Sequence, residues 1–124
     1  MKCDPIDIVA GGSAVLLGRI YDTNGSLFTT ATVSGATLNY RDTEDTSDTG
    51  TSITLNFSED SYLYDTLQTD AIWTDEKDST GFNFKYVLSG VLSTYNTTYW
   101  VEVTLEETNG NVVKFGWYIK TTGR

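Results

Sequence analysis

The chain has 124 residues, enough for one domain, and its 39% hydrophobic and 13% aromatic residues exclude a disordered composition. The formal net charge of −9 argues against nucleic acid and anionic membranes as partners, because both repel an acidic surface. Histidine is absent and Cys3 is the single cysteine, so an internal disulfide is excluded and the commonest general base is missing.

The first half of the chain consists of short segments in which apolar and polar residues alternate, the pattern of half-buried strands. Residues 1–12 are expected to form an extended arm or an edge strand, since residues 5–10 alternate briefly. Residues 26–33 are expected to be a link or a short strand after a turn at 22–25. Three further strands are predicted: 13–22 with Leu16 and Ile20 inward, 36–41 with Ala36, Leu38 and Tyr40 inward, and 51–57 with Ile53, Leu55 and Phe57 inward.

The middle of the chain is less regular. Residues 62–73 carry apolar side chains with only a weak period, and residues 74–80 read as a polar loop. Residues 82–88 predict another strand, with Phe82, Phe84, Tyr86 and Leu88 on one face. Because these segments recur about every ten residues with turn signals between them, we expect one all-β domain over 1–124, a sandwich or barrel of about seven or eight strands.

Residues 97–122 predict a β-hairpin, because two alternating runs flank an Asn109-Gly110 turn. A loop of only Asn109 and Gly110 would put the apolar residues of the two runs on opposite faces. A longer loop, residues 108–110 with Gly110 left-handed, puts them on one face, since a slip of one residue turns a strand over. The second register is therefore expected, and it pairs Leu105 with Val113, Val103 with Phe115, Val101 with Trp117 and Tyr99 with Ile119.

The outer face of this hairpin carries the main candidate for a binding surface. In the expected register Trp100 lies opposite Tyr118, and Glu102, Lys114 and Lys120 surround the pair. One interpretation is that the two rings only stabilise the hairpin, as cross-strand aromatic pairs do. The other is that they anchor a protein interface, with the charged residues as its polar rim.

Acidic residues gather in a loop at residues 42–50, which contains no apolar side chain. Asp42, Glu44, Asp45 and Asp48 are candidate calcium ligands, because calcium prefers oxygen ligands. The segment lacks the glycine and the terminal glutamate of an EF-hand loop, and a solvated loop of like charges accounts for the same residues. No cofactor is expected, and no catalytic group is evident, because nothing in the chain activates a serine and Gly-x-Ser-x-Gly is absent.

Several segments together resemble a known group of proteins. They are Leu16, Gly18 and Ile20 with the Asp22–Gly25 turn, then Asp65–Asp70, Trp73, Ser79–Phe84, and Tyr99–Val103 followed by the short Asn-Gly turn. Over about residues 13–120 they look like small immunoglobulin-like β-sandwich proteins. Such proteins are encoded among the head and tail genes of tailed phages and prophage-like clusters, and are similar to the amino-terminal domains of phage baseplate proteins.

The resemblance implies a single immunoglobulin-like antiparallel β-sandwich with a C-terminal hairpin, without enzymatic activity, in the neck, tail, baseplate or capsid decoration of a virion. Its partners would be other virion proteins or copies of itself, a homo-oligomer, and it would be made in the host cytoplasm. The sequence agrees in showing neither the apolar region of a signal peptide nor an apolar run of about 20 residues. The alternative is a carbohydrate- or calcium-binding module, suggested by the surface aromatics and the acidic loop.

Overall fold

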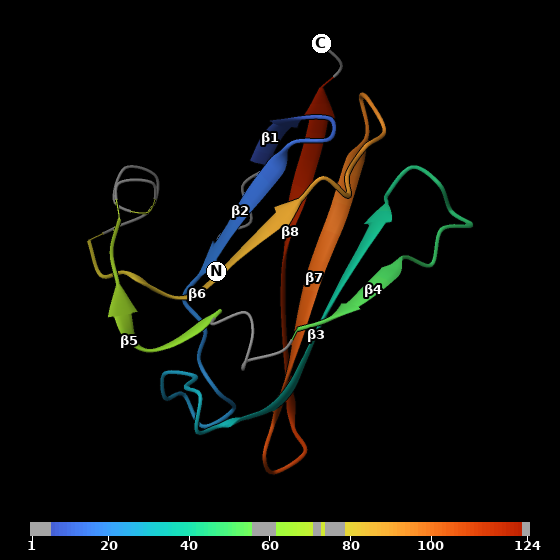
Figure 1. The fold of residues 1–124 in the computed structure, drawn as a ribbon. Coiled ribbons are helices and arrows are strands. Elements are labelled where there is room, and N and C mark those ends of the chain that lie inside the picture. Colours follow the sequence, from blue (N-terminus) through green and yellow to red (C-terminus); the bar gives the residue numbers. More distant parts are fainter. Residues whose placement is uncertain (1–5, 56–61, 71–72, 74–78, 123–124) are drawn as a thin grey trace.

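The computed structural model of the protein describes residues 6–55, 62–70, 73 and 79–122, and its fold is all-β. The described part of the chain forms strands in the order β1 (Ile6–Val9), β2 (Ser13–Gly18), β3 (Val33–Asp42), β4 (Thr51–Thr54), β5 (Leu63–Gln68), β6 (Phe82–Ser89), β7 (Thr98–Glu107) and β8 (Val112–Thr122). These strands make two sheets packed face to face as a β-sandwich (Figure 1).

The strand order is that of an immunoglobulin-like sandwich. One sheet is five-stranded in the order β1-β8-β7-β3-β4, and the other is three-stranded in the order β2-β6-β5. The larger sheet extends the three strands β8-β7-β3 by β4 on one side and by β1 on the other. The expected antiparallel sandwich is present, with one parallel pairing in it, that of β1 with β8. The first strand adds to the sheet of the last hairpin, on the side that β7 does not occupy.

The C-terminal hairpin has the predicted register. Leu105 pairs with Val113, Val103 with Phe115, Val101 with Trp117 and Tyr99 with Ile119. The loop closes as expected, since the Gly110 N–H donates to the Glu107 carbonyl at 2.9 Å and Gly110 has a φ of 92°. Six of the eight predicted inward residues are buried, whereas Val113 and Phe115 are only half-buried against the core. Their cross-strand partners Leu105 and Val103 are fully buried, so the exposure at this level of the hairpin falls on β8.

The core between the sheets contains most of the predicted inward residues. Leu16, Ile20, Ala36, Leu38, Leu55, Phe84 and Leu88 are buried there, while Tyr40, Ile53 and Tyr86 are partly buried. The predicted inward Phe57 lies outside the described residues. Phe84 stacks on Trp117 with ring centroids 5.9 Å apart, which joins the two sheets at the centre. The Trp117 Nε1–H also donates to the Leu17 carbonyl across the sandwich at 3.3 Å.

Tyr99 ties the loop before β7 to that strand. It stands at the start of β7, and its hydroxyl accepts a hydrogen bond from the Thr94 backbone N–H at 3.3 Å. This position and contact resemble the tyrosine corner of immunoglobulin-like folds. Val101, two residues further along, is fully buried where an antibody domain has its second cysteine.

The predicted strand 13–22 ends early, at Gly18. Beyond it the chain is held by the side chain of Asn83 on β6, which is fully buried. The Asn83 Oδ1 accepts from the Ile20 N–H at 2.7 Å, and its Nδ2 donates to the carbonyls of Ile20 and Phe28 at 3.0 and 2.8 Å. One side chain thus supplies the hydrogen bonds that a neighbouring strand would give, so residues 19–28 need not continue the sheet.

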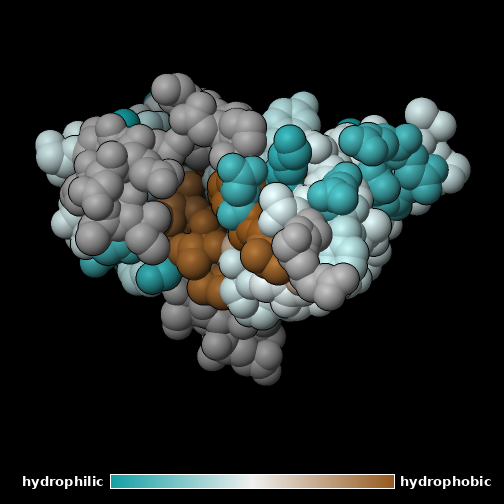
Figure 2. Space-filling model, turned by 90° about the horizontal axis from the view of Figure 1, so that it is seen from above, coloured by the Kyte–Doolittle hydropathy of each residue, from teal (hydrophilic) through white to brown (hydrophobic). Residues whose placement is uncertain are grey.

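A second apolar cluster covers the outer face of the three-stranded sheet. Leu17, Trp73 and Phe82 are buried in it, and Val15 and Tyr64 are partly buried against them. The irregular stretch 62–73 thus contains the strand β5 as far as Gln68, and Trp73, which packs over the sheet. From above, Figure 2 shows apolar surface near the centre and hydrophilic side chains on the right, over the loop between β3 and β4.

Candidate protein-binding face

The outer face of the five-stranded sheet presents two aromatic rings side by side. Trp100 on β7 pairs directly with Tyr118 on β8, and their ring centroids are 4.8 Å apart with the planes inclined at 52°. The side chains of Val101 and Trp117 next to them point into the core, so alternation along each strand sends the Trp100 and Tyr118 rings outward. The pairing predicted from the sequence is confirmed.

The Trp100 indole packs directly over Gly116 of the neighbouring strand. A Cβ atom at Gly116 would come within 2.5 Å of Trp100 Cζ2 and 2.6 Å of Cη2, so only glycine leaves room for the ring. Gly116 is buried, while Trp100 remains half-buried. Packing an aromatic side chain over a strand glycine compensates for the side chain that glycine lacks. In the expected register Gly116 lies diagonally across from Trp100, and this spacing is the sequence signal for the role of Gly116.

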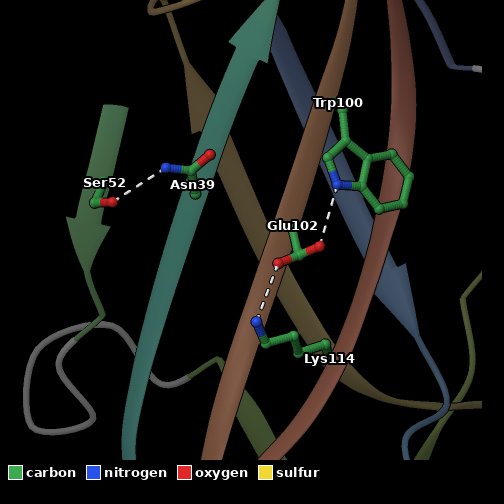
Figure 3. Close-up of polar contacts among 5 residues, drawn as sticks. All are labelled: Asn39, Ser52, Trp100, Glu102 and Lys114. Atoms are coloured by element: carbon green, nitrogen blue, oxygen red, sulfur yellow. Dashed lines mark hydrogen bonds and ion pairs between the residues drawn. The ribbon is translucent and has the colours of Figure 1, made fainter. Parts of the chain in front are cut away.

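Glu102 connects the aromatic pair to the charged rim of the face. The Trp100 Nε1–H donates to Glu102 Oε2 at 3.2 Å, and Lys114 Nζ lies 3.8 Å from Glu102 Oε1 (Figure 3). The indole N–H therefore has a partner within the sheet. This hydrogen bond and the packing over Gly116 hold the Trp100 ring in one orientation.

The rest of this face is polar and mixed in charge. Lys120 pairs with Thr98 on one side and with Asp7 of β1 on the other. Arg41 on β3 stands opposite Trp100, and Asn39 donates a hydrogen bond to Ser52 Oγ at 3.1 Å (Figure 3). Charged groups of both signs around a central aromatic pair give an interface orientation and partner selectivity more than affinity.

Part of the aromatic pair remains exposed. Tyr118 is 44% exposed although it packs on Trp100, whereas Trp73 and Phe82 on the other sheet are buried. A cross-strand pair stabilises its hairpin whether or not it also contacts a partner, so both interpretations fit this exposure. The face thus combines an aromatic centre with surface that remains in water.

The acidic loop uses its own carboxylates to hold its backbone. Asp42 accepts from the Glu44 N–H at 2.9 Å, Asp45 from the Ser47 N–H at 3.0 Å, and Asp48 from the N–H groups of Asp42 and Gly50 at 2.8 Å each. Hydrogen bonds from the Asp42 and Gly50 backbones lower the pKa of Asp48 below its ordinary range. Among the described residues no three His, Cys, Asp or Glu side chains are grouped so as to hold a metal ion.

The search for membrane-spanning segments covered the described residues, and it finds no helix there that is long and apolar enough to cross a bilayer. Comparisons of the chain with protein-family models, with curated protein sequences and with solved structures give no match. The strand order and the outer face of the five-stranded sheet are therefore the observations on which a function is argued.

Proposed function

We propose that this protein is a non-enzymatic structural subunit of a tailed-phage particle, and that it docks onto its neighbours through the outer face of the five-stranded sheet. The observation that carries the docking is the aromatic pair, Trp100 and Tyr118, open to solvent at the centre of a polar face. The placement in a virion, as part of a neck, tail, baseplate or capsid decoration, comes from the sequence resemblance.

Energetics support docking through this pair. Burying apolar area contributes about 25 cal/mol per Å², and aromatic side chains carry much of that area at interfaces. The rim residues Glu102, Lys114 and Lys120 are poised to set the orientation of the partner. Neighbouring copies of this chain or other particle proteins are the proposed partners, since repeated assemblies reuse one surface on every copy.

The alternative module, for carbohydrate or calcium, has less support. The two rings are inclined at 52°, so they do not form one flat platform for a sugar ring. The carboxylates of Asp42, Asp45 and Asp48 already accept backbone hydrogen bonds within their loop. If the loop did bind calcium, the melting temperature would rise in millimolar calcium relative to a chelator control.

The proposal is tested by co-expressing the chain with the products of the genes that flank its own and purifying the assembled particles. We expect the protein in the particles, and we expect the Trp100→Ala/Tyr118→Ala double variant to fold but to be lost from them. Tyr95→Ala is the matched control, because Tyr95 is 55% exposed away from the sheet and loses a similar ring.

Two results would contradict the proposal separately. Flanking genes that encode no particle proteins would remove the virion placement. Particles that incorporate the double variant as well as the wild type would move the docking surface elsewhere, and the aromatic pair would then only stabilise its hairpin. Circular dichroism of each variant establishes that it is folded.

A further inference from the structure

The outer edge of β4 offers unpaired main-chain groups. The Leu55 N–H donates to the Ala36 carbonyl at 3.0 Å, so Leu55, Ile53 and Thr51 bond to β3 in the alternating antiparallel pattern. The Thr43 N–H donates to the Thr98 carbonyl at 3.0 Å, so the odd-numbered residues of β3 bond to β7 and the even-numbered ones bond to β4. The main-chain N–H and C=O groups of Ser52 and Thr54 therefore point away from the sheet.

No described strand lies beyond β4, and the view in Figure 1 shows this edge on the open right side of the sandwich. Proteins usually protect such an edge by keeping the strand short or by placing a charge, a proline or a bulge on it. β4 is short, but its sequence, Thr-Ser-Ile-Thr, carries no charge and no proline, and its pairing with β3 is regular. The edge strand β1 carries Asp7, and the edge strand β5 carries Asp65 and an irregular register.

Charge indicates what would occupy this edge. The chain carries a net charge of −9, and the loop that leads into β4 holds Glu44, Asp45 and Asp48. A second copy of the chain would bring the same negative charge to the edge and be repelled. A basic segment would be attracted over the distance of the Debye length, about 8–10 Å at physiological salt.

We propose that the edge of β4 receives an extended segment of a partner protein, rich in Lys or Arg, as an added strand. Ser52 and Thr54 supply the main-chain hydrogen bonds, which hold an added strand largely independently of its sequence. The acidic loop supplies selectivity for positive charge. This contact is distinct from the aromatic pair, which lies two and three strands away on β7 and β8, so it does not rest on the proposed function.

Thr54 allows a test that removes one main-chain donor without touching the sheet. Its N–H points outward, so Thr54→Pro keeps every bond between β3 and β4, and proline is tolerated on such an edge. Thr54→Ala is the matched control, because it shortens the same side chain and keeps the N–H. Both variants should melt close to the wild type.

The probe is an acetylated, amidated peptide of sequence Lys-Thr-Val-Thr-Val-Lys, titrated into the isotope-labelled protein and followed by NMR. We expect the Ser52 and Thr54 amide signals to shift at millimolar peptide, with binding about tenfold weaker in Thr54→Pro and unchanged in Thr54→Ala. A peptide with Glu in place of both Lys should bind at least about fivefold more weakly, and sodium chloride should weaken the Lys peptide.

Absence of amide shifts at Ser52 and Thr54, or equal binding by the proline and alanine variants, would overturn the added strand. Equal binding of the Lys and Glu peptides would overturn the basic partner. Shifts of the same two amides with protein concentration alone, strengthened by salt, would identify a second copy as the occupant and also overturn the proposal.

Discussion

The two outer faces of the sandwich differ in how much of their aromatic side chains is exposed to solvent. On the three-stranded sheet, Trp73 is only 4% exposed and packs with Leu17 and Phe82 into a cluster of its own. On the five-stranded sheet, Tyr118 and Trp100 pack on each other and Tyr118 stays 44% exposed. Folding covers the aromatic side chains of the first face, whereas part of the aromatic pair on the second face remains in water. Replacing comparable residues on the two faces should therefore affect different properties.

Trp73→Ala should give the largest loss of stability and Trp100→Ala a much smaller one. Removing a buried tryptophan costs about 3–5 kcal/mol, whereas losing an exposed cross-strand pair costs about 1 kcal/mol. Urea denaturation of both variants at one pH measures the difference. Equal losses would mean that Trp100 serves the fold as much as Trp73 does, and the comparison between the faces would fail.

Asn83→Leu should destabilise the protein by about 2–4 kcal/mol, because the Ile20 N–H and the Phe28 carbonyl lose their hydrogen bonds to Asn83 and the Ile20 carbonyl keeps only the Phe28 N–H. Asn83 lies between Phe82 of the outer cluster and Phe84 of the core, so the loss should reach both layers. Chemical denaturation gives the magnitude, and amide exchange should show faster exchange at Ile20. A variant as stable as the wild type would contradict the role of this side chain.

Gly116→Ala should cost about 1–3 kcal/mol through overpacking, because its Cβ would meet both the Trp100 ring and the Val101 carbonyl. We also expect a changed tryptophan emission spectrum as the indole is lifted from the sheet. Thr104→Ala, on the same outer face of β7, is the control. An unchanged spectrum and stability would show that the indole does not lie on Gly116.

The smallest effect concerns Asp48 and Asp65, one on each side of the molecule. Backbone hydrogen bonds from Asp42 and Gly50 lower the pKa of Asp48, and backbone and hydroxyl hydrogen bonds from Thr30 lower the pKa of Asp65. A carboxyl group whose pKa is lower in the folded state stabilises the protein at pH values above its pKa in the unfolded state. This stabilisation is lost as the pH falls through the pKa of the folded state. Asp48→Asn and Asp65→Asn should each flatten the fall in melting temperature below about pH 4. Glu44→Gln is the control for removing one charge, and its melting temperature should fall more steeply at acid pH than that of either variant.

The hairpin was predictable because two independent constraints agree. Alternation over ten or more residues sets the faces of β7 and β8, and Asn109-Gly110 places the turn, so one register satisfies both. The aromatic pair at Trp100 and Tyr118 followed from that register without further assumption. The strand β3 began earlier than expected, at Val33, because Val33 pairs with Glu107 across a bulge that no alternation reveals.

The three-stranded sheet could not be predicted in the same way, because its order depends on contacts between distant residues. Asn83 ends one strand early by bonding to residues 55 and 63 positions away, and Trp73 closes over Leu17 from a segment without a period. The parallel pairing of β1 with β8 joins the two ends of the domain. Each of these contacts joins residues that are far apart in the sequence, and local patterns do not encode such contacts.

The pairing of β1 with β8 has a mechanical consequence. Because the two strands run in the same direction, a pulling force applied at Ile6 and at Thr122 slides them past each other. The main-chain hydrogen bonds between the two strands are then loaded at the same time. In an antiparallel hairpin pulled apart from its open end, the hydrogen bonds break one after another. A domain clamped in this way resists tension along the line between its first and last strands.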